Sequence, residues 1–267
     1  MISGRIAFIR NNITRVCQKI GRNPQEITVV GVTKFATVEN IKEAVAAGVT
    51  DIGENRVQAA REKFPLLSGL AVRRHMIGHL QTNKVKLALE LFDMIQSVDS
   101  FPLAEEIQKQ AERQARVVDI LVQVDCAGEV QKFGVPKDEA LALIAKIQEL
   151  KNINIQGLMT IAPFVDSIVS RGHARGTDAV LAHGVAAATD HGQVAPDRAS
   201  PDDETVIRAC FRDLRLVRDQ VNQKFARHER VTMKYLSMGM THDYLIALEE
   251  GANMLRIGTA IFAGKEE

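Results

Sequence analysis

Aromatic residues are scarce in this sequence, and their scarcity limits what its core can be made of. Tryptophan is absent, and Phe and Tyr bring the aromatic share of the 267 residues to only 4%. Hydrophobic residues nevertheless make up 46% of the chain. The core must therefore be aliphatic, built from Val, Ile, Leu and Ala. Because hydrophobic content is high and charged residues reach only 25%, global disorder is excluded.

Cysteine is also scarce, which excludes two kinds of scaffold. Cys17, Cys126 and Cys210 lie far apart and form no CxxC pair, so neither a disulfide framework nor a zinc finger is expected. We expect Cys126 and Cys210 to fill core volume. His75 and His79 are spaced i, i+4, but they lie across the end of a predicted strand and its loop, so we expect no metal site there.

The chain also lacks a charge excess and any long hydrophobic run. Its formal net charge is +1, whereas a surface that neutralises a nucleic-acid backbone needs a marked basic excess. No apolar run approaches the ~20 residues that span a bilayer. The N-terminus carries arginines within its apolar stretch, unlike a signal peptide. We therefore expect a soluble, cytoplasmic monomer that binds neither nucleic acid nor membrane.

Two periodicities alternate along almost the whole chain. Short β-branched runs predict strands, and apolar residues at helical spacing lie between them. Eight strands separated by helices predict a single (β/α)8 barrel of the TIM type over residues 1–267, with a doubly wound open sheet as the alternative. Too few residues follow the last strand for an eighth outer helix, so we expect a helix over 3–20 to cover that gap. The predicted strands are 27–33, 49–54, 72–78, 94–99, 117–125, 153–161, 232–239 and 254–262.

One segment, 164–203, breaks this rhythm. It is rich in glycine, has more aspartates than arginines, and shows weak periodicity. Loops beyond ~12–15 residues are uncommon in compact domains. We therefore expect a long, mobile surface insertion after the sixth strand, dispensable for ligand binding and available to a partner. The next helix is expected to open at Pro201, with Ser200 as its N-cap.

Polar residues follow the predicted strands where a barrel builds its active site. Lys34 comes directly after the first strand, at the barrel mouth, where partial desolvation makes an amine nucleophilic. Position alone leaves two interpretations open, a lysine that forms a Schiff base and a solvated lysine at a strand end. His75 lies on the third strand.

The loops after the seventh and eighth strands predict a phosphate site. These loops contain Ser237 and Gly239, and then Gly258 and Thr259. Glycine lets backbone N–H groups approach an oxyanion, and the hydroxyls add donors. A lysine together with a phosphate site suggests pyridoxal 5′-phosphate (PLP). Arg256, two residues before Gly258, would keep the pyridine nitrogen unprotonated, because guanidinium only donates.

At this point the sequence resembles the pyridoxal phosphate homeostasis protein family, which is related to the N-terminal barrel of alanine racemase. The resemblance implies that Lys34 holds PLP as a Schiff base and that Asn55 lies beside the cofactor. It also implies that Arg256 faces the pyridine nitrogen. The implied phosphate-binding residues are Ser237, Gly239, Gly258 and Thr259. The matching blocks are VVGVTK (29–34), AVAAGVTDIGENRVQ (44–58), RHMIGHLQTNKVK (74–86), QGLMTIAP (156–163), LSMGM (236–240) and RIGTAIFAG (256–264).

The sequence departs from the family pattern in three places. Family members have a proline soon after the lysine, where this chain reads Phe35-Ala36-Thr37. Phe133 stands where a small residue is usual, although Lys132 keeps the family's lysine. The 164–203 segment is also longer than the family norm, so no role is carried over to it.

The resemblance implies a protein that holds PLP for intracellular vitamin B6 homeostasis without catalytic turnover, with PLP-dependent apoenzymes as recipients. The alternative is a PLP-dependent amino-acid racemase. Racemisation needs a second acid/base group, which alanine racemase takes from a tyrosine on an additional β-domain. We expect no such domain here, and neither Tyr235 nor Tyr244 is well placed to replace it. A third interpretation, a sugar-phosphate enzyme without PLP, would not explain Lys34 together with Arg256.

Overall fold

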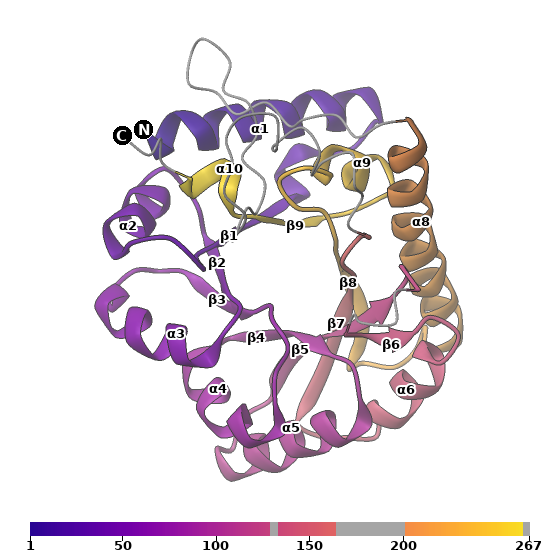
Figure 1. Ribbon diagram of the computed structural model, residues 1–267. Coiled ribbons are helices and arrows are strands. Elements are labelled where there is room, and N and C mark those ends of the chain that lie inside the picture. Colours follow the sequence, from indigo (N-terminus) through magenta and orange to yellow (C-terminus); the bar gives the residue numbers. More distant parts are fainter. Residues whose placement is uncertain (129–132, 164–200, 264–267) are drawn as a thin grey trace, which may run out of the picture.

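Parallel strands close into a barrel, and helices surround it on the outside (Figure 1). The computed structural model describes residues 1–128, 133–163 and 201–263. The ring runs β1-β2-β3-β4-β5-β7-β8-β9 and closes by pairing of β9 with β1, so the predicted (β/α)8 barrel is confirmed and the open sheet is wrong. The strands are β1 (Thr28–Val32), β2 (Asp51–Glu54), β3 (Arg73–Met76), β4 (Met94–Val98), β5 (Val118–Asp125), β6 (Val135–Pro136), β7 (Ile153–Met159), β8 (Val231–Ser237) and β9 (Met254–Ile257).

The helices follow the strands in the expected alternation. Thr37 caps α2, because its side chain accepts a hydrogen bond from the Asn40 backbone N–H at 3.2 Å. The α-helices are α1 (Ile2–Lys19), α2 (Val38–Ala46), α3 (Val57–Lys63), α4 (Val85–Leu91), α5 (Phe101–Arg113), α6 (Ala140–Ile147), α8 (Pro201–Lys224), α9 (Tyr244–Glu249) and α10 (Thr259–Phe262). Short 3-10 helices are η1 (Pro24–Glu26), η2 (Phe64–Leu67) and η3 (Thr82–Lys84).

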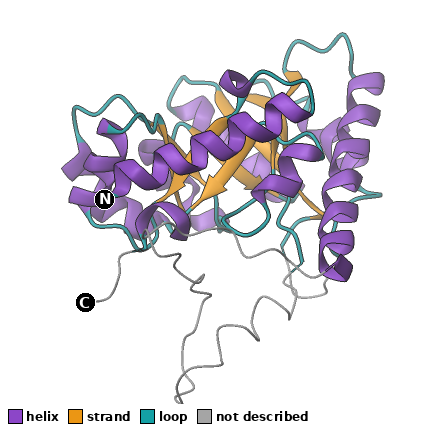
Figure 2. Ribbon diagram, turned by 90° about the horizontal axis from the view of Figure 1, so that it is seen from above, coloured by secondary structure: helices purple, strands orange, loops and turns teal. Residues whose placement is uncertain are grey.

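The N-terminal helix covers the gap that the sequence leaves on the outside of the barrel. It lies across the barrel and packs against α2, α9 and α10 (Figure 2). Its buried side chains recur at helical spacing, and Asn12 donates a 3.0 Å hydrogen bond to the Tyr244 hydroxyl. This prediction is confirmed. Two details of the strand prediction were wrong. The last strand ends at Ile257 rather than 262, because 259–262 forms α10, and the two-residue strand β6 was missed.

The core has two parts that follow the alternation of each strand. The larger part lies between the strands and the outer helices, and it is mostly aliphatic, with a few buried aromatic rings such as Phe64, Phe211 and Tyr244. The smaller part fills the inside of the barrel with Val30, Met94, Leu121, Met159 and Met254. Most of the predicted 164–203 insertion lies outside the described residues, and α8 begins at Pro201 as expected. In the described part of the chain, no helix is both long and apolar enough to cross a membrane.

Candidate functional site

Most of the predicted site residues lie at one end of the barrel, in four neighbouring loops. Strand β1 pairs with β2 on one side and with β9 on the other, and β9 pairs with β8. The loops that follow these strands therefore lie side by side at the carboxyl end of the barrel. They contain Lys34, Asn55, Gly239 and the pair Gly258-Thr259.

Lys34 lies in the turn after β1, and its side chain is exposed. The strand ends at Val32, and a hydrogen bond from the Ala36 N–H to the Thr33 carbonyl closes the turn that carries Lys34 outward. Its Nζ lies 4.5 Å from the centroid of the Phe35 ring, which is itself 77% exposed. The expectation of a partly desolvated amine was therefore wrong, since the turn holds the lysine at the surface of the mouth.

An ion pair between Lys63 and the buried Glu54 holds the backbone around Lys34 in place. Lys63 Nζ, from α3, lies 2.8 Å from Glu54 Oε1 and donates to the Thr33 carbonyl at 2.6 Å. It also reaches the Lys34 carbonyl at 3.4 Å. The Glu54 side chain is 1% exposed, and its other oxygen accepts from the Asn55 N–H at 3.0 Å. One carboxylate thus joins the ends of β1 and β2. Sequence reasoning missed Lys63, although Glu54 lies within the AVAAGVTDIGENRVQ block (44–58).

Asn55 supplies a polar atom that the described part of the chain does not pair. Its Oδ1 is buried and has no hydrogen-bond partner there. A buried acceptor left unpaired costs about 1–3 kcal/mol, so this oxygen is suited to a donor on a ligand. The Asn55 backbone is fixed by Gly78, where an added Cβ would lie only 2.2 Å from the Asn55 carbonyl oxygen.

The loops after β8 and β9 form a close-packed pair rich in hydroxyls and glycine. Gly239 has φ +95°, and a Cβ there would lie 2.6 Å from the Ala247 Cβ, so glycine is required. At Gly258 a Cβ would lie 3.3 Å from the Val32 Cβ. Thr259 Oγ1 donates to Thr241 Oγ1 at 3.0 Å. Thr241 was missed, although it directly follows the LSMGM block.

Ser237 does not join this hydroxyl pair. It is the last residue of β8, its side chain points into the barrel, and it is fully buried. Its Oγ donates to Gln96 Oε1 at 2.6 Å and accepts from Arg256 Nη1 at 2.8 Å. The structure therefore brings Ser237 to the predicted ring-nitrogen arginine rather than to the two glycine loops.

Arg256 lies inside the upper barrel and is only 4% exposed. Besides Ser237 it donates to the Thr160 carbonyl at 2.9 Å. Burial lowers its pKa to about 10, and the nearby charge of Asp243 opposes that shift. Burial in turn raises the pKa of Asp243 to about 6, although the Met240 N–H and the charge of Arg256 stabilise its ionised form. At neutral pH the arginine is charged and can only donate.

Two rings from the loops after β3 and β5 stack on each other at the mouth of the barrel. The rings of His79 and Phe133 stack with centroids 3.9 Å apart at 12°, and Gln123 donates to the Phe133 carbonyl at 2.7 Å. Phe133 is 55% exposed, so the residue that departs from the family pattern lies at the surface of the mouth. Lys132 lies outside the described residues.

The two remaining cysteines meet at the same end of the barrel. Cys126 follows β5 and is half-buried, whereas Cys210 on α8 is 3% exposed. Their thiols hydrogen-bond, and this contact together with burial raises the pKa of Cys126. The prediction of core filling is confirmed for Cys210 and holds only in part for Cys126.

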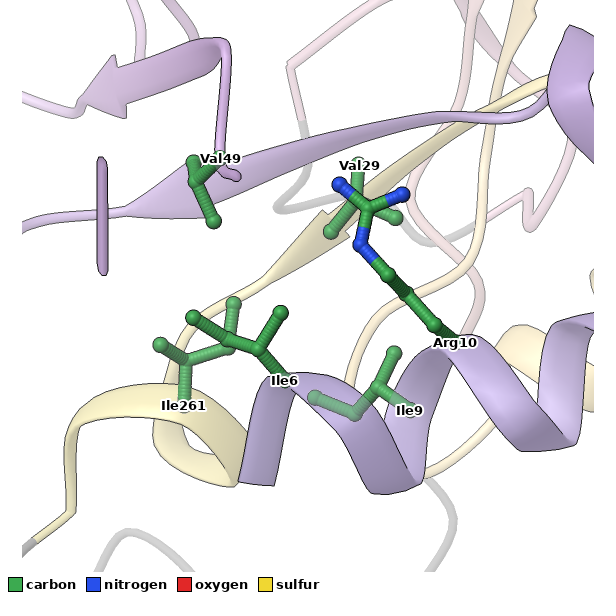
Figure 3. Close-up of a pocket in the computed structure, with 6 residues that line it drawn as sticks. All are labelled: Ile6, Ile9, Arg10, Val29, Val49 and Ile261. Carbon is green, nitrogen blue, oxygen red and sulfur yellow. The ribbon is translucent and has the colours of Figure 1, made fainter. Parts of the chain in front are cut away.

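A small crevice with a volume of about 10 Å³ lies beneath α1, away from the mouth (Figure 3). Ile6, Ile9 and Arg10 project from α1 toward Val29 and Val49. Its lining is otherwise aliphatic, and the guanidinium of Arg10 is already bonded to the Gly48 carbonyl at 2.6 Å. We assign this crevice to packing between α1 and the barrel.

Comparison with known proteins identifies the family of this chain. The family described as "Alanine racemase, N-terminal domain" matches residues 5–266. A pyridoxal phosphate homeostasis protein of Aquifex aeolicus is 33% identical, covering 98% of this chain and 97% of its own. The Escherichia coli (strain K12) protein of the same name is 27% identical and covers 99% of this chain and 97% of its own.

Solved structures show the same arrangement of strands. PipY of Synechococcus elongatus PCC7942, solved with PLP bound, has a TM-score of 0.73 at 28% identity and covers 98% of this chain and 100% of its own. Alanine racemase of Clostridium difficile 630 has a TM-score of 0.68 at 14% identity, with 99% of this chain matching 58% of that enzyme. This second likeness concerns the fold alone. The chain belongs to the alanine racemase N-terminal domain family and, within it, to the pyridoxal phosphate homeostasis proteins.

Proposed function

We propose that this protein binds PLP at the carboxyl end of its barrel and serves intracellular PLP homeostasis without catalytic turnover. The observation that carries the proposal is the convergence of Lys34, Asn55, the Gly239 and Gly258 loops and the buried Arg256 on one end of the barrel. The cytoplasm as location, a monomeric state and PLP-dependent apoenzymes as recipients belong to the same proposal.

The residues at the mouth fit PLP by three independent features. The buried Asn55 Oδ1 has no partner in the described chain and awaits a donor. The glycine loops bring backbone and the hydroxyls of Thr241 and Thr259 together, which suits a phosphate group. The charged Arg256 supplies a permanent donor for a ring nitrogen. Lys34 has the reactive amine, on a turn that the Lys63–Glu54 pair holds in place.

In this arrangement each residue has a distinct task. PLP, when bound, supplies an aldehyde that combines reversibly with an amine. Lys34 provides that amine, and its exposure leaves it accessible to an incoming ligand. Gly239, Gly258, Thr241 and Thr259 would hold the phosphate. Ser237 contributes from within the barrel, where its oxygen accepts from Arg256.

The tyrosines support a binding role over the racemase alternative. Racemisation requires two acid/base groups on opposite faces of the substrate. The hydroxyl of Tyr235 lies 3.4 Å from Arg73 Nη1, at the opposite end of the barrel, where β3 begins. Tyr244 is 2% exposed beneath α1, and burial raises the pKa of its phenol. Both phenols are therefore engaged away from the mouth.

Borohydride reduction of the PLP-loaded protein tests the binding site. We expect the reduced pyridoxyl group on Lys34, located by peptide mass spectrometry, and no such adduct in Lys34→Ala. The Lys109→Ala variant, which removes an exposed lysine of α5, should label as fully as the wild type. A pyridoxyl group on Lys63 or Lys132 instead would overturn the assignment.

Exchange of the α-proton tests the absence of turnover. The loaded protein is incubated in deuterated water with alanine, serine or glutamate, and uptake at Cα is followed by NMR. We expect no uptake above that of free PLP. Saturable deuterium uptake would move the protein to the racemase class while leaving the PLP assignment intact.

A further inference from the structure

A continuous chain of buried polar groups runs through the barrel and ends at Arg256. Arg256 Nη1 donates to Ser237 Oγ at 2.8 Å, and Ser237 Oγ donates to Gln96 Oε1 at 2.6 Å. Gln96 Nε2 lies 2.9 Å from His75 Nδ1, and His75 Nε2 lies 2.9 Å from Asp51 Oδ1. His75, Gln96 and Ser237 are 0% exposed. The chain links strands β2, β3, β4, β8 and β9.

The carboxylate at one end fixes the direction of every hydrogen bond. Although burial alone would raise the pKa of Asp51, hydrogen bonds from His75 and Thr50 lower it, so Asp51 is an ionised acceptor. His75 Nε2 then carries a proton, and Nδ1 of the neutral ring is an acceptor. Gln96 therefore turns its amide nitrogen toward His75 and its oxygen toward Ser237. The Ser237 proton is committed to Gln96, and its lone pairs face Arg256.

We propose that Gln96 is a positioning residue for Arg256, because it orients the Ser237 hydroxyl so that the oxygen accepts from the guanidinium. This inference rests on the proposed function, in which Arg256 faces the ring nitrogen of PLP. Ser237 could instead point its proton toward Arg256 if Gln96 did not accept it. Two donors would then oppose each other, and the guanidinium would lose one of its two fixed contacts inside the barrel.

The surroundings of Gln96 favour the observed orientation of its amide while the His75 ring is neutral. Its Nε2 also lies 3.2 Å from Met254 Sδ, so both amide hydrogens have acceptors. A flipped amide would place its oxygen against the lone pair of His75 Nδ1. Because unpaired buried polar groups are costly, the observed orientation is the stable one. None of this depends on a ligand, so the arrangement is present before PLP arrives.

Substitutions of two buried glutamines on the neighbouring strands β4 and β5 distinguish orientation of the Ser237 hydroxyl from packing inside the barrel. Gln96→Met keeps the side-chain volume and removes the acceptor for Ser237. Gln96→Glu keeps an oxygen that accepts from Ser237. Gln123→Met is the control, because Gln123 is also buried at 5% exposure but bonds to the Phe133 carbonyl. The dissociation constant for PLP, the borohydride labelling of Lys34 and the free energy of unfolding are measured for each.

We expect Gln96→Met to raise the dissociation constant for PLP by about tenfold, with reduction by borohydride still placing the pyridoxyl group on Lys34. Gln96→Glu and Gln123→Met should stay within about twofold of the wild type. Equal losses in Gln96→Met and Gln123→Met would overturn the proposal in favour of a packing role. So would an unchanged dissociation constant in Gln96→Met.

A second measurement uses the wild-type chain without ligand, and it decides the matter even if Gln96→Met does not fold. Long-range ¹H–¹⁵N correlations report which ring nitrogen of His75 carries the proton. We expect the Nε2–H form, and protonation at Nδ1 would overturn the direction of the chain. A wild-type protein that binds no PLP would overturn the proposed function. Wild-type binding with an indifferent Gln96→Met would overturn only the role of Gln96.

Discussion

Removal of the Lys63 amine should destabilise the protein and disturb the turn that carries Lys34. In Lys63→Met, Glu54 loses its cationic partner at 2.8 Å while its side chain is only 1% exposed. Breaking a buried pair in this way costs about 3–5 kcal/mol, because it leaves an uncompensated charge. Lys63 itself is 21% exposed, so water enters more readily and we expect about 3 kcal/mol, the lower end of that range.

That loss should lower the melting temperature by about 5 °C for a chain of this size, measured by calorimetry. The Thr33 and Lys34 carbonyls also lose their donor, so labelling of Lys34 by PLP and borohydride should slow. Lys109→Met is the matched control. Its Nζ pairs with Glu106 at 3.6 Å but the lysine is 58% exposed, so the melting temperature should stay within about 1 °C.

The double variant Lys63→Met with Glu54→Gln separates the charge from the packing. Because the neutral amide that replaces the carboxylate needs no counter-charge, the second substitution should recover more than half of the stability lost in Lys63→Met. A melting temperature for Lys63→Met equal to that of the Lys109→Met control would refute the reasoning. A double variant less stable than Lys63→Met would also refute it, since the penalty would not then come from the unpaired carboxylate.

Three further predictions concern the residues around the site. The pKa of Asp243 is raised from 3.8 to about 6, so its contribution to stability is fully present below pH 3.8 and is lost as the pH rises through 6. The free energy of unfolding of Asp243→Asn should therefore rise by about 3 kcal/mol relative to the wild type across that window, because only the wild type must bury a charge as the pH rises. Urea unfolding measures this difference. A difference that stays constant with pH would contradict the burial of the charge. Gly78→Ala should lower the free energy of unfolding by about 1–3 kcal/mol, because the added Cβ would meet the Asn55 carbonyl oxygen at 2.2 Å. Gly4→Ala is the control, since a Cβ there has no atom within 4 Å, and it should be neutral or stabilising. Equal shifts in melting temperature for the two variants would contradict this contact. Arg208→Ala should lower the free energy of unfolding by only about 1–2 kcal/mol, because Arg215 still pairs with the buried Glu250 at 3.1 Å. Chemical denaturation measures the loss, and a loss above that range would show that Arg215 does not compensate.

The order and position of the barrel strands could be predicted from the sequence because most strands lie in short runs rich in β-branched residues between helical patterns. The end of the last strand could not. The last three residues of α10 (Ala260, Ile261 and Phe262) are apolar and buried like most of β9, and a short apolar run does not distinguish a strand from a helical turn. The polar ends of β1, β2, β8 and β9 could be predicted as one cluster, because parallel strands bring their carboxyl ends to the same side.

The hydrogen-bond and ion-pair partners of these residues could not be predicted from the sequence. Gln96 and His75 are 21 residues apart and meet Ser237 only because the barrel closes, so no local spacing marks the contact. Lys63 was hidden for the same reason, on a helix whose exposed face carries other charges. The exposure of Lys34 could not be predicted, because the sequence does not show that the strand ends at Val32 and that a turn carries the lysine outward.

Under the proposed function, the interior of the barrel suits holding PLP better than activating it. Arg256 has a pKa of about 10, well above neutral, so it remains a donor under physiological conditions. A ring nitrogen that faces a permanent donor stays unprotonated, and an unprotonated ring withdraws electrons weakly from a substrate carbon. The chain from Asp51 through His75 and Gln96 reinforces this state, because each group in it already has its proton assigned. Under the proposed function, a site built in this way would stabilise attachment at Lys34 and provide little driving force for breaking a bond at Cα.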